Sequence, residues 1–168
     1  MTWLPFDLHP EYPPEGLPRA QLLARYGPGM TDHVRSFLEA RGLPYEPHPE
    51  VVPNSRKALA LTELARDLGL HAVTHDRLMD AYWAEAQDLG DRDVLRRLAA
   101  EVGLPPPQVE EVLATDVYVD RVLASTRDAV SLGANAVPAF VLDRRLLVLG
   151  AQPEDVFEQA FAQLAETP

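Results

Sequence analysis

The middle of the chain repeats apolar residues at spacings of three and four, which is the pattern of helices that bury one face. In the clearest run, Asn54 or Ser55 is the expected N-cap and Gly69 is the expected stop. The expected buried positions of this run are Leu59, Leu61, Leu64, Ala65 and Leu68. The same reasoning predicts helices over residues 17–26, 31–42, 74–86, 91–103, 105–115 and 116–133, with an extended or irregular proline-rich segment at residues 43–53.

The two ends of the chain follow a different pattern. Residues 2–8, TWLPFDL, alternate loosely, and Pro5 restricts them to an edge strand. Near the other end, apolar residues 139–142 and 146–149 flank the letters DRR and predict a β-hairpin. A final helix is expected from Pro153, with inward positions at Val156, Phe157, Ala160, Phe161 and Leu164. The expected order is therefore strand, helical middle, strand, strand, helix.

A proline stands at the mouth of the first hairpin strand, in the run ANAVPAFVL at residues 134–142. Because proline donates no backbone hydrogen bond, Pro138 must occupy the first residue of a strand, an edge or a bulge. A small-residue loop of this kind can present its backbone to a ligand. The loop is therefore a candidate binding site.

Length and charge narrow the class of protein. A chain of 168 residues forms one domain, or one core with an insertion. The net charge is −11 and the basic residues form no long block, so neither nucleic acid nor an anionic membrane is an expected partner. No apolar run approaches the roughly 18 residues that span a bilayer, and the first residues lack the pattern of a signal peptide. The expected location is the cytoplasm.

The sequence contains no cysteine. Disulfides, thiolate catalysis, zinc–thiolate sites and iron–sulfur clusters are therefore excluded for these residues. No cofactor is expected, and the sequence has no patterned Ser–His–Asp context that would indicate a serine hydrolase.

Two polar clusters are explained more simply as helix starts. His71 and His75 are four residues apart, a spacing that can put two imidazoles on one helix face for a metal. However, Thr74 is the expected N-cap between them, and no third ligand is near in sequence. Asp91 is likewise an expected N-cap and Asp93 a first-turn charge. No metal ligand is therefore assigned.

Other titratable and aromatic residues also have ordinary explanations. His9, Glu11 and Tyr12 lie in a proline-rich connector, where a solvated loop is expected rather than an acid–base site. Tyr82 and Trp83 could line a ligand cleft, but core packing is favoured for Tyr82. No catalytic residue is assigned.

Four segments, in chain order, carry a family resemblance. They are WLPFDLHPEYPPEG, PNSRKALALTELARDLG, LMDAYWAEAQDLGDRDVLRRLAAEVGL and LGANAVPAFVLDRRLLVLGAQPEDVFEQAF. Together they resemble the DsbA-like thioredoxin family, in particular its FrnE-like branch, which is related to 2-hydroxychromene-2-carboxylate isomerases. The resemblance implies a thioredoxin-like (DsbA-type) α/β fold with a large all-α insertion, in which the first strand and first helix of the family are absent. It implies a second thioredoxin strand and connector at 1–29, the helical insertion at 30–133, and the proline loop, hairpin and C-terminal helix at 134–168.

The activity of that family is thiol–disulfide oxidoreduction at a Cys-x-x-Cys motif on the first helix, whose end lowers the thiol pKa. Because this chain has neither the motif nor that helix, it is expected to be redox-inactive as written, and whether it is an enzyme stays open. A longer reading frame that adds the motif upstream of Met1 is one version of this expectation.

The resemblance also assigns a role to the proline loop. It implies that the Val137–Pro138 bond is cis and that Ala136, Val137 and Pro138 bind a substrate. Ala136 stands where relatives commonly carry glycine, which restricts the backbone slightly.

Two alternative functions stay open. The chain could be a non-catalytic module that binds a peptide or a small thiol at the proline loop, or a glutathione-dependent isomerase- or transferase-like protein. The first strand of the family is interior in its sheet, so its absence would leave an open slot that invites another strand. A second copy of the chain or a partner chain is expected to fill the slot.

Overall fold

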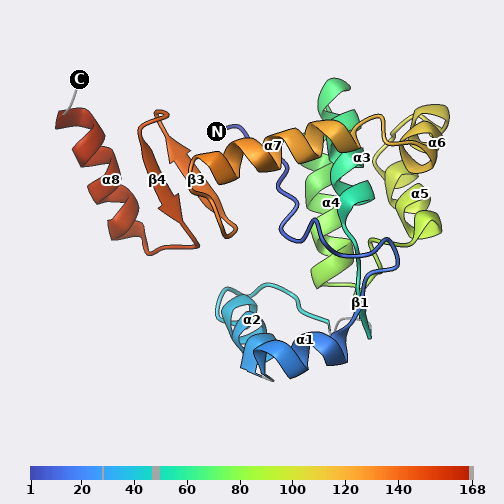
Figure 1. Cartoon of the computed structure of the whole chain (residues 1–168), viewed down its shortest axis with the longest axis horizontal. Helices are drawn as coiled ribbons and strands as arrows, with labels where there is room; N and C mark the ends of the chain where they lie inside the picture. The colour runs from blue at the N-terminus through green and yellow to red at the C-terminus, as the bar shows by residue number, and fades with distance from the viewer. Residues whose placement is uncertain (28, 47–49, 167–168) are drawn as a thin grey trace. The chain divides into compact units, whose positions relative to one another are not determined.

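The computed structural model describes residues 1–27, 29–46 and 50–166 (Figure 1). The chain divides into two compact units: the helical unit, His9–Val122, and the hairpin unit, which joins Met1–Leu8 to the chain from Leu123 onward. The later boundary falls inside helix α7 (Val119–Ser131), so these units do not coincide with the ranges predicted from the family, which stay a prediction. No helix of the described ranges is both long and apolar enough to cross a bilayer.

The helical unit has one apolar centre, formed by the last four helices that lie wholly inside it. Its helices are α1 (Arg19–Tyr26), α2 (Gly29–Glu39), α3 (Arg56–Asp67), α4 (His71–Trp83), α5 (Arg92–Glu101) and α6 (Pro106–Ala114). Strands β1 (Leu17–Pro18) and β2 (Val51–Val52) form a short antiparallel ladder. Helix α3 packs on α4 and α6, and α5 packs on the same two helices. The largest fully buried side chains of the unit are Leu61, Leu95, Leu98, Val112, Leu113 and Val122.

Two helix starts follow the predicted signals. The Asp91 carboxylate accepts a hydrogen bond from the Asp93 amide at 2.7 Å, which caps α5 as expected. At α3 the two candidates are resolved in favour of Asn54, whose side-chain oxygen accepts from the Arg56 amide at 3.0 Å, whereas Ser55 makes no side-chain cap bond.

The start of α4 differs from the prediction. The helix begins at His71, so Thr74 lies inside it and is buried rather than acting as an N-cap. The connection from α3 is short because Gly69 adopts a φ of +74° and the Leu70 amide returns to the Ala65 carbonyl at 2.7 Å. The chain is therefore already in position to form a helix at His71.

The hairpin unit contains the predicted β-hairpin and the final helix. Strands β3 (Ala139–Leu142) and β4 (Leu146–Leu149) pair antiparallel, with Leu142 opposite Leu146 next to the turn. Asp143 and Arg144 adopt φ angles of 50° and 55°, and the Arg145 amide bonds the Leu142 carbonyl at 3.0 Å. Positive φ at both central residues is the geometry that suits the twist of a tight hairpin.

Helix α8 (Glu154–Glu166) packs on one face of this hairpin. On this face, the Phe140 ring meets Phe157 of α8 edge to face, with ring centroids 5.0 Å apart. Figure 1 shows α8 beside β4. On the other face, a Cβ added at Gly133, just after α7, would lie 3.5 Å from a Leu147 methyl. This second face thus meets the residue that follows α7 at Leu147, while Val141 on the same face stays 45% exposed.

Residues 2–8 form no strand, contrary to the prediction of an edge strand. Within the described residues of the hairpin unit only β3 and β4 pair, so this segment has no neighbouring strand with which to form a ladder. It is fixed instead by a buried hydrogen bond of 2.8 Å from the Asp7 amide to the Thr126 hydroxyl of α7.

Two apolar positions predicted to be buried are exposed. Phe161 is 57% exposed, because α8 turns Ala160 inward and the next residue lies about 100° further round the helix. Leu68 is 40% exposed, because α3 ends at Asp67 and the chain turns away.

Candidate binding site at the proline loop

The proline loop, residues 134–138, starts from a well-fixed helix end. Gly133 adopts a φ of +94°, and its amide bonds the Val130 carbonyl at 2.9 Å. The Ala134 amide reaches the Ala129 carbonyl at 3.0 Å, and the Ala134 side chain is 2% exposed. These bonds satisfy the last carbonyls of α7 and anchor the first residue of the loop.

The other end of the loop is anchored by the hairpin. The Val137–Pro138 peptide bond is cis. The Pro138 carbonyl accepts a hydrogen bond of 2.7 Å from the Gly150 amide, and Ala139 opens strand β3 opposite Leu149. Proline therefore stands one residue before the ladder, where no amide proton is needed.

The residues between the two anchors present free backbone. Within the described residues, no hydrogen bond is made by the backbone N–H or C=O of Ala136 or Val137. The Val137 side chain is 49% exposed, and Ala136 is half-buried. An exposed amide and carbonyl beside the start of a strand are the groups to which an extended chain can add.

The loop carries no group that could perform acid–base or nucleophilic chemistry. Its side chains are those of Ala134, Asn135, Ala136, Val137 and Pro138, and none of them titrates near neutral pH. What this arrangement can do chemically is to hold an extended ligand. The family resemblance implies this role for the consecutive residues Ala136, Val137 and Pro138, and the role stays a prediction.

The histidine pair lies on one continuous helix. The rings of His71 and His75 are stacked, with centroids 5.9 Å apart and planes 5° from parallel. The predicted N-cap at Thr74 between them is therefore wrong. Burial, followed by the charge of Arg66, lowers the pKa of His71. Across the described ranges no three His, Cys, Asp or Glu side chains gather as metal ligands.

The remaining sequence candidates form two groups of residues that are neighbours in the sequence. The His9 ring stacks on Tyr12 at 4.4 Å, and its Nδ1 lies 3.1 Å from the Glu11 carboxylate, in an open connector. Tyr82 meets Trp83 edge to face at 4.9 Å, and burial raises the pKa of Tyr82. That burial agrees with the favoured packing role for Tyr82 and gives no sign of a cleft.

Comparison with known proteins adds three findings. Residues 1–162 match the family described as the DSBA-like thioredoxin domain. The chain is 28% identical over 165 residues to the uncharacterized protein YwbO of Bacillus subtilis, an alignment that covers 96% of this chain and 80% of the relative. The structure resembles a probable DsbA oxidoreductase from Streptomyces coelicolor with a TM-score of 0.85 and 32% identity, over 97% of this chain and 74% of the other.

A more distant structure shares the fold. It is a 2-hydroxychromene-2-carboxylate isomerase, with a TM-score of 0.68 and 18% identity over 81% of this chain and 66% of the other. The fold of the chain is accordingly the DsbA-like thioredoxin fold, and its helical unit corresponds in character to the predicted all-α insertion.

Proposed function

Because the chain belongs to the DSBA-like thioredoxin domain family, and because its 168 residues contain no cysteine, we propose that it binds an extended peptide or a small thiol without dithiol chemistry. The observation that carries this proposal is the free backbone of Ala136 and Val137 beside Pro138. Binding is by hydrogen bonds from the ligand backbone, as when a strand adds to the edge of a sheet.

The expected affinity is modest. Each backbone hydrogen bond contributes about 0.5–1.5 kcal/mol net, because water competes for both partners. The half-exposed Val137 side chain adds apolar contact. Recognition is therefore broad in sequence and demands an extended ligand.

Two variants at one position test the proposal. Val137→Pro removes the amide proton, whereas Val137→Thr keeps both the backbone groups and the β-branched shape. By calorimetry with a cysteine-free extended peptide, Val137→Pro is expected to weaken binding about fivefold or more and Val137→Thr to leave it within about twofold. Equal binding by both variants, with both folded by circular dichroism, would contradict backbone recognition.

Glutathione separates this proposal from the alternative of a glutathione-dependent isomerase- or transferase-like protein. Likeness to the isomerase at 18% identity concerns the fold alone. The alternative requires saturable glutathione binding together with turnover of an electrophilic or isomerisable substrate. The binding proposal requires neither turnover nor reduction of insulin in the presence of dithiothreitol.

We further propose that a second copy pairs with β3. In the described sheet β3 pairs with β4 along one edge only, and Val141 of β3 is 45% exposed. A two-stranded hairpin is marginal by itself and gains from a third strand. Light scattering behind size-exclusion chromatography is expected to report a dimer, and a monomer at all concentrations would overturn this part. The cytoplasmic location also stays a proposal, which cell fractionation tests.

A further inference from the structure

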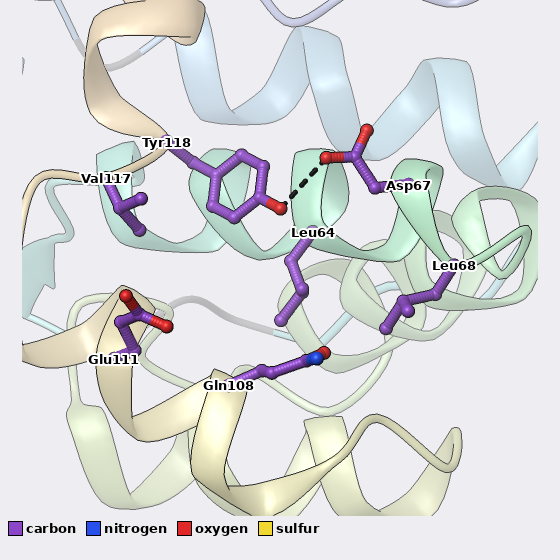
Figure 2. A pocket seen from close by; sticks show the side chains of 7 residues that line it. All are labelled: Leu64, Asp67, Leu68, Gln108, Glu111, Val117 and Tyr118. Atoms are coloured by element: carbon purple, nitrogen blue, oxygen red, sulfur yellow. Dashed lines mark hydrogen bonds between the residues drawn. The ribbon is translucent and has the colours of Figure 1, made fainter.

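The helical unit contains a hollow that sequence reasoning did not predict. It has a volume of about 250 Å³ and lies between the last turns of α3, helix α6 and the connection that leads into α7 (Figure 2). Its residues are far apart in the chain, so only the packing of α3 on α6 brings them together.

The floor and two walls of the hollow are apolar. Leu64 lies at the bottom and is 3% exposed. Leu68 and Val117 flank the opening and are 40% and 52% exposed. A ligand with an apolar body would cover both of them.

One side of the rim is already neutralised. The Asp67 carboxylate accepts a hydrogen bond from the Tyr118 hydroxyl at 2.9 Å and two from the Arg121 guanidinium at 2.8 and 3.0 Å. The hydrogen bonds from Arg121, which have the largest effect, and from Tyr118 lower the pKa of Asp67. The Asp67 charge is thus matched by Arg121 and is not available for a ligand cation.

The opposite side of the rim carries an unmatched charge. Gln108 and Glu111 stand three residues apart on α6, and Figure 2 shows both side chains across the hollow from Asp67 and Tyr118. Within the described residues, neither side-chain head group makes a hydrogen bond or an ion pair. The hollow therefore combines an apolar floor with one free carboxylate and one free amide.

We propose that this hollow binds an organic cation that has an apolar body and a primary ammonium head. The body lies on Leu64 between Leu68 and Val117, and the ammonium donates to the Glu111 carboxylate and the Gln108 amide oxygen. A volume of about 250 Å³ holds one aryl- or alkylamine, or the end of one lysine side chain. An anionic ligand would face Glu111 without a compensating cation.

The test uses a matched pair of probes on the intact chain. 2-Phenylethylamine carries the ammonium, and 2-phenylethanol has the same body without the charge. In a titration followed by amide NMR, the amine is expected to saturate the shifts of residues 64–68 and 108–118 and to bind about tenfold or more tightly than the alcohol. Equal affinities, or shifts that map elsewhere, would overturn the proposal.

A pair of variants on the same helix assigns the charge. Glu111→Gln is expected to lower amine affinity about tenfold and to leave alcohol binding unchanged. Glu110→Gln is the control, because Glu110 is also exposed on α6 but is paired with Arg96 at 2.6 Å. Loss of affinity in both variants, or in neither, would contradict the role of Glu111.

A peptide titration distinguishes two possible sources of the ammonium, a small amine and the lysine side chain of another protein. A short peptide with one lysine is compared with its norleucine counterpart. Tighter binding by the lysine peptide than by the free amine assigns the hollow to a protein side chain, and the reverse assigns it to a small amine. No preference for an ammonium in either arm overturns the inference.

Discussion

The helical unit and the hairpin unit bury their apolar side chains to very different extents. Among the described residues, the buried hydrophobic side chains of the hairpin unit are Ala134, Val148 and Ala160, while all the others belong to the helical unit. The large hydrophobic side chains that the hairpin unit exposes are Met1, Trp3, Leu4, Leu8, Val130, Leu132, Val137, Val141 and Phe161.

This difference suggests that the helical unit contributes mainly to stability and the hairpin unit mainly to binding. The helical unit has a packed centre that can supply most of the free energy of folding. The hairpin unit has small buried side chains and a broad apolar surface, which is the character of a surface that another chain covers. The proline loop belongs to the second kind of region, and substitutions should act accordingly.

The largest contrast is expected between two leucines. Leu113 is fully buried in the helical unit, and Leu132 is 58% exposed in the hairpin unit. Leu113→Ala should lower the free energy of unfolding by about 2–5 kcal/mol, because it leaves a cavity, and Leu132→Ala by less than about 0.5 kcal/mol. Urea denaturation measures both losses, and similar values would show that the two units do not differ in how their leucines contribute to stability.

A smaller loss is expected at the one lysine of the chain. The Lys57 ammonium donates to the Val112 carbonyl at 3.1 Å and to the Thr115 carbonyl, at the end of α6, and lies 3.1 Å from the Asp116 carboxylate. Lys57→Met should cost about 1–3 kcal/mol, because it leaves these carbonyls without a donor.

The control for this change is Arg127→Met. Arg127 is exposed in the hairpin unit and should tolerate the substitution within about 0.5 kcal/mol. If thermal unfolding shows the same shift for both variants, the hydrogen bonds of Lys57 do not stabilise the end of α6.

A still smaller, pH-dependent effect is expected at Asp67. Hydrogen bonds from Arg121 and Tyr118 lower its pKa below the ordinary 3.8. A carboxylate with a lowered folded pKa contributes stability that is fully present above the unfolded value and is lost as the pH falls through the folded one. Asp67→Asn should therefore cost less than about 1 kcal/mol at neutral pH, because the pair is partly exposed.

The same comparison at acidic pH shows whether the charge of Asp67 stabilises or destabilises the folded state. The difference between Asp67→Asn and the parent chain should shrink as the pH falls below 3.8. A difference that grows in acid would show that the pair with Arg121 destabilises the folded state.

Features set by local sequence were the predictable ones. Asp91 caps its helix because its carboxylate needs only the amides of Asp93 and Val94, and the hairpin follows from two short apolar runs around a three-residue turn. The position of Pro138 at a strand mouth followed from its missing amide proton. In each case the cause and its effect lie within a few residues.

Features set by tertiary packing were not predictable in the same way. Thr74 resembles an N-cap locally, but the short turn after Gly69 starts the helix earlier. Residues 2–8 alternate like a strand, yet a strand also needs a partner. The Gly150 amide donates to the Pro138 carbonyl and leaves the backbone of Ala136 and Val137 without a partner among the described residues. No local sequence pattern indicates this pairing.

Amide NMR of the intact chain, titrated with a cysteine-free extended peptide, shows whether the proline loop binds an extended chain. Saturable shifts centred on Ala136, Val137 and Ala139 are expected, and they should be lost in Val137→Pro and kept in Val137→Thr. Shifts that spare the proline loop while the peptide still binds, or no binding by the parent chain, would rule out this binding role.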